Sequence, residues 1–235
     1  MKNIYILTIV AALAAPLGSA FAGDITGKIT LKGTPPKERD ITPLKDDANC
    51  GKFHSTMPTT RFFVVGAGGE LADAVVYLQG VSGKSTGAAA APAVMDQKNC
   101  EYVPQIFAVQ TGQKLSVKNS DPVLHNVHVQ PTAAGNKEDN KAQMAGSADL
   151  ILSFDKPELF MKFKCDVHPW MFAWVSVFDH PYFAVSGKDG TFKIANVPAG
   201  KYTLEVAHRK AGTTKQEIEV KDGEPTKVEL SLEVK

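Results

Sequence analysis

After residue 22 the sequence has no apolar run that approaches the ~20 consecutive apolar residues of a membrane-spanning helix. It also lacks excess charge. Residues 1–22 hold one of the 26 basic residues and no acidic one, so 25 basic residues face 25 acidic residues in the remainder. This balance gives no reason to expect nucleic acid or an anionic membrane as a partner. No Ser/His/Asp set, phosphate-binding glycine loop or carboxylate pair stands out, and we expect no enzyme.

The first 22 residues, MKNIYILTIVAALAAPLGSAFA, combine one lysine, an apolar middle and a small-x-small ending at Ala20, Phe21 and Ala22. This pattern is typical of a secretory signal peptide that is cleaved before Gly23. We therefore expect an exported protein in the periplasm.

Metal-ligating side chains are concentrated in the segment CDVHPWM, where Cys165, His168 and Met171 have a C-x2-H-x2-M spacing. A thiolate, imidazoles and a thioether form a soft donor set that suits copper, and the blue-copper arrangement needs two histidines. The best candidate for the second is His125, which begins an alternating run 40 residues before Cys165. Strand alternation sends His128 to the opposite face, so we expect it to be a surface or hydrogen-bonded residue.

The pair of segments LHNVHV and CDVHPWM resembles the cupredoxin (blue type 1 copper) family, and within it is most similar to the amicyanins, over about residues 95 to 178. The resemblance implies that His125, Cys165 and His168 are the strong ligands of one type 1 copper ion. It implies Met171 as the axial ligand and Asn126 as a residue that ties the two ligand segments together. The alternative for such a cysteine and methionine is ordinary core packing.

The same resemblance implies a function. It points to a blue copper protein that carries single electrons between periplasmic redox partners, a dehydrogenase or a c-type cytochrome. A copper-binding and delivery protein without electron transfer is the alternative. Pro169, Trp170 and Phe172 are candidates for an apolar rim through which a partner approaches His168, with core packing as the other interpretation. No recognisable spacing joins His54, His180 and His208 into a second metal site.

Cysteine is scarce, with three residues in the chain. In an exported protein, two bonded cysteines leave the third unpaired. With Cys165 assigned as a ligand, Cys50 and Cys100 are predicted to form a disulfide. Two buried free thiols are the alternative.

The rest of the chain has the period-2 patterns and turn signals of strands, and no helical periodicity persists. Expected strands include 24–33, 61–66 and 72–80, and residues 131–149 are expected to form a long loop. The segments KDGTF and PAGKYTL near the C-terminus resemble carboxypeptidase regulatory-like (transthyretin-like) sandwiches. The expected fold is all-β: a cupredoxin-like Greek-key sandwich plus a second, discontinuous, transthyretin-like β-sandwich.

The predicted organisation inserts the copper domain into the second sandwich, since insertion is tolerated at exposed loop tips. The parts are the signal peptide (1–22), the first half of the split sandwich (24–92), the copper domain (95–178) and the second half of the split sandwich (180–235).

Overall fold

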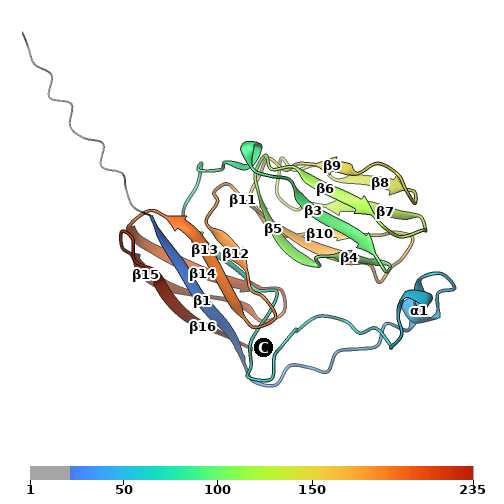
Figure 1. Cartoon of the computed structure of the whole chain (residues 1–235), viewed down its shortest axis with the longest axis horizontal. Helices are drawn as coiled ribbons and strands as arrows, with labels where there is room; N and C mark the ends of the chain where they lie inside the picture. The colour runs from blue at the N-terminus through green and yellow to red at the C-terminus, as the bar shows by residue number, and fades with distance from the viewer. Residues whose placement is uncertain (1–21, 235) are drawn as a thin grey trace, which may run out of the picture.

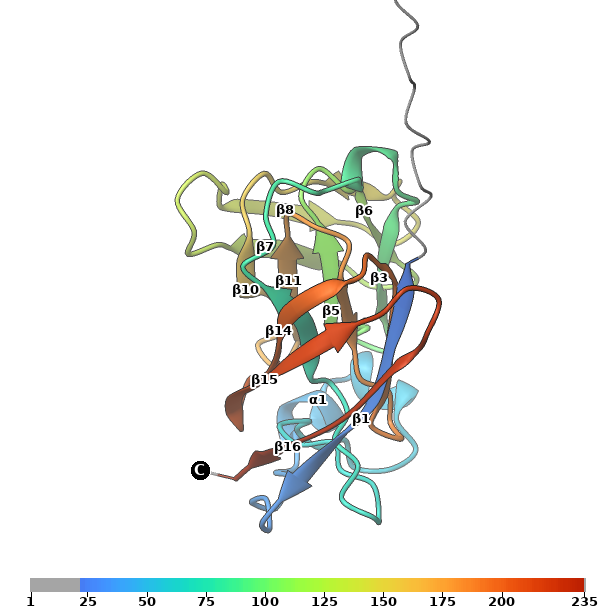
Figure 2. The same ribbon diagram turned by 90° about the vertical axis from the view of Figure 1, so that its left-hand side faces the viewer.

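The computed structural model describes residues 22–234 and is built mainly of β-strands (Figures 1 and 2). The prediction of an all-β fold is confirmed. The predicted signal peptide lies, except for Ala22, outside the described residues. Within those residues no helix is long and apolar enough to cross a membrane.

One sandwich is made from the two ends of the described chain. Its first sheet has the order β13 (Thr191–Val197), β1 (Gly23–Lys32), β16 (Thr226–Glu233), and its second the order β12 (Phe183–Val185), β2 (Val75–Gln79), β14 (Gly200–His208), β15 (Gly212–Val220). Alternate side chains of β1 point inward, and Ile29 shares a core with Leu78 and Leu204. We call this unit the split sandwich.

The other sandwich is continuous in sequence. Its larger sheet has the order β5 (Ile106–Gln110), β11 (Phe172–Phe178), β10 (Glu158–Lys164), β7 (His125–Gln130), β8 (Asp139–Gln143), and its smaller sheet the order β4 (Glu101–Val103), β3 (Ala93–Lys98), β6 (Leu115–Asn119), β9 (Leu150–Leu152). Met95, Val127 and Phe163 lie in its separate core. We call this unit the metal sandwich. Its insertion as a domain stays a prediction, because strand pairing does not show that either sandwich folds alone.

Two local predictions were wrong. Residues 61–66 form no strand, because the backbone N–H groups of Phe62 and Phe63 donate to the carboxylate of Glu38 instead of to a neighbouring strand. The expected long loop at 131–149 contains β8, which pairs with β7. This edge strand has little apolar sequence, since of its five residues only Gln143 is buried, and periodicity therefore did not reveal it.

The connection between β1 and β2 carries two short helices, α1 (Thr42–Asp46) and η1 (Cys50–Phe53). A third, η2 (Gly87–Ala89), lies in the linker after β2. Figure 1 shows the chain leaving β1, crossing to the end of the metal sandwich where α1 lies, and returning. The predicted disulfide between Cys50 and Cys100 is confirmed and joins this connection to the metal sandwich.

Candidate metal centre

Two neighbouring strands bring the predicted ligands together. β7 begins at His125, and β10, its antiparallel neighbour, ends at Lys164 directly before the ligand loop. The loop is closed by its own backbone: Cys165 N–H donates to the carbonyl of Met171 (3.0 Å) and Met171 N–H donates to that of His168 (2.9 Å). The short spacing of the motif therefore becomes a tight turn that returns the chain into β11.

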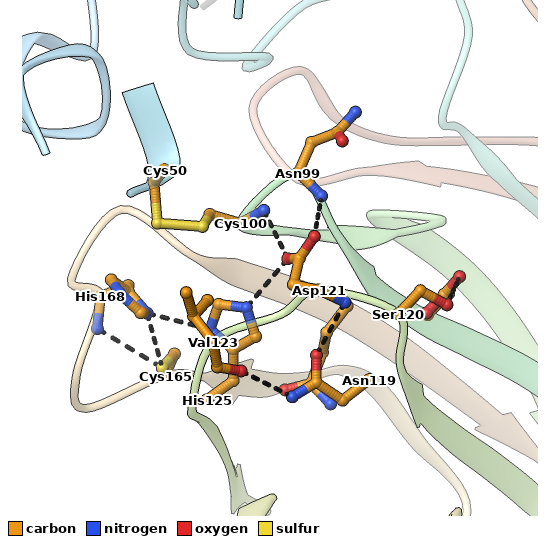
Figure 3. A network of polar contacts seen from close by, with 12 residues as sticks. Cys50, Asn99, Cys100, Asn119, Ser120, Asp121, Val123, His125, Cys165 and His168 are labelled. Carbon is orange, nitrogen blue, oxygen red and sulfur yellow. Dashed lines mark hydrogen bonds and ion pairs between the residues drawn. A yellow bond between two sulfur atoms is a disulfide. The ribbon is translucent and has the colours of Figure 1, made fainter. Parts of the chain in front are cut away.

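His125, Cys165 and His168 form one cluster (Figure 3). The Nδ1 atoms of the two histidines are 2.9 Å apart, and Sγ of Cys165 is 3.8 Å from Nδ1 of His168. One ligand atom from each residue lies within 4.8 Å of the others. The side chains are buried, with 0%, 2% and 8% exposed for His125, Cys165 and His168. The sequence predicted one site for these three residues, and the structure brings their ligand atoms together.

Met171 lies at the end of the loop and is also buried. It belongs to the same core cluster as Cys165. The backbone bonds of Met171 to Cys165 and His168 keep its backbone beside theirs. The structure therefore places the predicted axial residue next to the cluster.

Asn126 spans the two ligand segments. Its Oδ1 accepts from the N–H of Asp166 (2.6 Å) and from the thiol of Cys165 (3.2 Å), and its own backbone N–H points at the sulfur (3.5 Å). Its Nδ2 donates to Oδ1 of Asn140 (2.6 Å), on the strand β8 that the sequence did not reveal. This geometry matches the linking role that the resemblance implied for Asn126.

Asp121 is a residue of the candidate site that sequence reasoning missed. Its Oδ2 lies 2.9 Å from Nε2 of His125, and its two oxygens accept the backbone N–H groups of Asn99 and Cys100, each at 2.7 Å. The side chain is buried, with 4% exposed. Its position four residues before His125, in a polar turn, was the only available signal. Such a carboxylate fixes the orientation of a ligand imidazole.

Electrostatics favour the ligand forms of two of the three residues. Burial raises the pKa of Cys165, but its contact with His125 and the backbone N–H groups around the sulfur outweigh burial and lower the pKa overall. Burial and the charge of His125 lower the pKa of His168. Thiolate and neutral imidazole are the forms that bind metals.

His125 is shifted the other way. Burial lowers its pKa, but Asp121 and Cys165 raise it more, so the net pKa of His125 is above its ordinary value. Asp121 and Cys165 therefore favour positive charge at this position. A cation bound between the three residues would supply such a charge.

The other histidines lie apart from the cluster. His128 has its two ring nitrogens on Asp166 (2.9 Å) and Glu138 (2.6 Å), at the surface side of β7. His180 and His208 lie at the split sandwich. His54 has Nε2 at 2.9 Å from the carbonyl of Asn99.

The predicted apolar rim around His168 is partly covered by the α1–η1 segment. Trp170 is half-buried, donates its indole N–H to the carbonyl of Cys100 (3.2 Å) and packs against Leu44 and Cys50. Pro169 is exposed and Phe172 half-buried. The α1–η1 segment approaches the cluster, because Asp47, Cys50 and His168 have potential ligand atoms within 4.8 Å of one another.

The chemistry of the donor set decides which group fits a metal. Two further groups gather near the cluster, Asp47 with Cys50 and His168, and Cys100 with Asp121 and His125. Cys50 and Cys100 are bonded to each other, so neither group offers a thiolate. Of the three groups, the one formed by His125, Cys165 and His168 alone combines a free cysteine with two imidazoles. This soft set fits copper, with Met171 beside it.

No family model matches the chain, and no curated protein matches it. Solved structures give partial matches. Copper-containing nitrite reductase (NirK) from Thermus scotoductus SA-01 is 17% identical, with 37% of this chain and 22% of the reductase covered and a TM-score of 0.34. A purple cupredoxin from Nitrosopumilus maritimus is 21% identical, with 36% and 98% covered and a TM-score of 0.30.

A point mutant of amicyanin in its oxidised state is 22% identical, with 43% of this chain and 97% of amicyanin covered and a TM-score of 0.33. Similarity at this level does not identify the residues of the site. The chemistry of the centre is therefore inferred from the residues of this chain.

Proposed function

We propose that this protein is an exported blue copper protein that carries single electrons between periplasmic redox partners, and that it is not an enzyme. The observation that carries the proposal is the convergence of two imidazole Nδ1 atoms and one free, buried thiol. His125, Cys165, His168 and Met171 would hold one type 1 copper ion. Copper bound there would supply one-electron exchange between Cu(I) and Cu(II).

The surrounding residues hold the ligands in place. The ring of His125 is fixed at Nε2 by Asp121, and the sulfur of Cys165 faces the backbone N–H groups of Asn126 (3.5 Å) and His168 (3.4 Å). Ligands that are held in advance need little rearrangement when the charge at the centre changes by one. Low rearrangement favours electron transfer over chemistry on a bound substrate.

Burial keeps water from the centre. The most exposed of the three ligands, His168, has 8% of its surface exposed, and Met171 is buried as well. Four buried ligand groups do not suit catalysis at the metal, which needs an open coordination position. We therefore favour an electron carrier over an oxidase or reductase.

The proposed partners are redox proteins. A periplasmic dehydrogenase would supply electrons, or a c-type cytochrome would accept them, as the cupredoxin resemblance implies. Copper binding and delivery without electron transfer remains the second candidate. A colourless Cu(I) protein that hands its metal to an acceptor would favour delivery.

The test is spectroscopic. The mature chain is loaded with copper and oxidised, and we expect an intense visible thiolate-to-copper band with reversible one-electron reduction. Cys165→Ser removes the only free thiol of the described chain and should abolish the band completely. Met95→Leu, a change at another buried sulfur of the same core, is the matched control and should keep it. A band that survives in Cys165→Ser would refute the ligand assignment.

A further inference from the structure

The α1–η1 segment lies over the outer side of the metal centre. We define the cover as residues 42–54, which contain α1, η1 and His54. The cover belongs to the connection between β1 and β2 of the split sandwich, yet it lies at the end of the metal sandwich (Figure 1). Figure 3 shows the Cys50–Cys100 disulfide beside His168 and His125.

The cover approaches one of the proposed ligands, His168. Nδ1 of His168 is turned toward His125 and Cys165, so the remaining edge of the ring faces away from the proposed metal. Asp47 and Cys50 of the cover each have a polar or sulfur atom within 4.8 Å of that ring. With the cover in place, only 8% of His168 is exposed.

The cover is a small unit with its own internal bonds. Asp47 Oδ1 accepts the N–H groups of Asn49 (2.9 Å) and Cys50 (2.8 Å), and Lys45 Nζ donates to the carbonyl of His54 (2.6 Å). These bonds do not involve the metal sandwich. The cover can therefore keep its shape when it moves as a body.

The cover is held on the metal sandwich by the Cys50–Cys100 disulfide, by the contact of His54 Nε2 with the carbonyl of Asn99 (2.9 Å), and by a small apolar cluster that includes Leu44, Val123 and Trp170. None of the strands in the described chain pairs with residues 42–54. The disulfide is thus the one covalent latch on a segment that lacks sheet bonds.

We propose that residues 42–54 form a cover latched by the Cys50–Cys100 disulfide, which closes the ring of His168 to solvent and to other molecules. Loss of the latch opens the ring, while the ligands themselves stay in place. The proposal names how access to the centre is controlled, and only its relevance to copper rests on the proposed function. A protein that docks at this end of the molecule meets the cover before it meets His168.

The test uses the metal-free protein, so that it does not depend on copper binding. Diethylpyrocarbonate modifies accessible imidazoles, and peptide mass spectrometry measures the modification rate of each histidine separately. In Cys50→Ser/Cys100→Ser, we expect the rate at His168 to rise by about tenfold or more, because a segment without sheet bonds opens locally. His180 and His208 are buried at the split sandwich, away from the cover, and their unchanged rates show that this sandwich remains folded. A circular dichroism spectrum that matches the original protein shows that the metal sandwich remains folded as well.

A second variant covers the case in which the double mutant unfolds. Leu44→Ala keeps the disulfide and removes the buried side chain of the cover, so it should raise the rate at His168 by a smaller factor. Lys52→Ala, at an exposed position of the cover, is the matched control and should change nothing. Rates at His168 that stay within about twofold of the original in every folded variant would overturn the proposal. The spectrum of the copper-loaded protein separately reports whether the centre binds copper at all.

Discussion

The two sandwiches bury histidines to nearly the same extent but use them differently. His125 and His168 of the metal sandwich are 0% and 8% exposed, and His180 and His208 at the split sandwich are 3% and 4% exposed. Burial alone therefore does not distinguish a proposed ligand from a structural residue. The hydrogen-bond partners of the ring nitrogens distinguish the two kinds of histidine.

At the split sandwich, Nδ1 of each histidine ring accepts a backbone N–H from a residue two or three positions later. Nδ1 of His180 accepts the N–H of Tyr182 (3.1 Å), and Nδ1 of His208 accepts that of Ala211 (3.2 Å). In the metal sandwich, the two Nδ1 atoms face each other beside a thiol and accept no backbone N–H. Ring nitrogens that converge on a common point, without backbone donors, are available to bind a metal.

The comparison assumes that the two sandwiches are separate cooperative units, and Ile29→Ala tests this assumption. Ile29 is fully buried in the core of the split sandwich, so its truncation should cost about 2–5 kcal/mol of unfolding free energy. We expect the visible copper band of the folded protein to be unchanged, because the metal sandwich has its own core.

Denaturant unfolding, followed by circular dichroism and by the copper band, measures both effects. Ile151→Ala is the control, since Ile151 of β9 is 56% exposed and its loss should cost little. A copper band that weakens in Ile29→Ala under native conditions would show that the sandwiches are one unit and would argue against the inserted-domain organisation.

His208→Gln tests whether a buried histidine of the split sandwich makes the unfolding free energy depend on pH. Burial, followed by the charge of Arg209, lowers the pKa of His208 to about 4. An unfolded histidine has a pKa of about 6.5, so between these values the unfolded chain binds the proton more tightly. Stability from this residue is complete above pH ~6.5 and is lost as the pH falls toward ~4, by about 3 kcal/mol in total.

The measurement is the unfolding free energy of the metal-free protein near pH 7.5 and near pH 4.5. His208→Gln should lose less stability on acidification than the original protein, by about 2 kcal/mol or more. His54→Gln, in the exposed contact with Asn99, is the control. An identical pH dependence in the original protein and in His208→Gln would mean that this ring is not held neutral by burial.

The sequence predicted the centre better than its surroundings. Cys165, His168 and Met171 share one short motif, and His125 lies at the start of a clear alternating strand, so local pattern was enough to name residues that the structure brings together. The Cys50–Cys100 disulfide followed once Cys165 was assigned to the metal. These inferences needed only spacing and chemistry.

The missed features depend on contacts between distant segments. Residues 61–66 have a strand-like composition, but Glu38 takes their backbone donors. β8 forms because β7 offers it an edge, although its own sequence is polar. The cover on His168 comes from the connection between two strands of the other sandwich, and no local pattern indicates where such a connection lies.

Asp121→Asn tests whether the partner of the far ring nitrogen helps to make His125 a ligand. The carboxylate of Asp121 orients His125 through Nε2, and loss of such a partner to a ligand histidine typically costs about 10–100-fold in metal affinity. The amide of asparagine carries no charge to balance the metal. Its NH₂ group would also face a donor, because the two oxygens of Asp121 accept the N–H groups of Asn99 and Cys100.

Competition with a copper chelator measures the affinity, and the unfolding free energy of the metal-free variant separates ligand orientation from general damage. Asp189→Asn is the matched control: Asp189 of the split sandwich also accepts a backbone N–H, from Thr191 (3.0 Å), but it is in a turn without a histidine, and copper affinity should not change. Equal affinities in Asp121→Asn and Asp189→Asn would show that His125 is oriented by the fold of β7 alone. A loss confined to Asp121→Asn would show that the carboxylate is part of the centre and that a buried histidine becomes a ligand partly through what holds its far nitrogen.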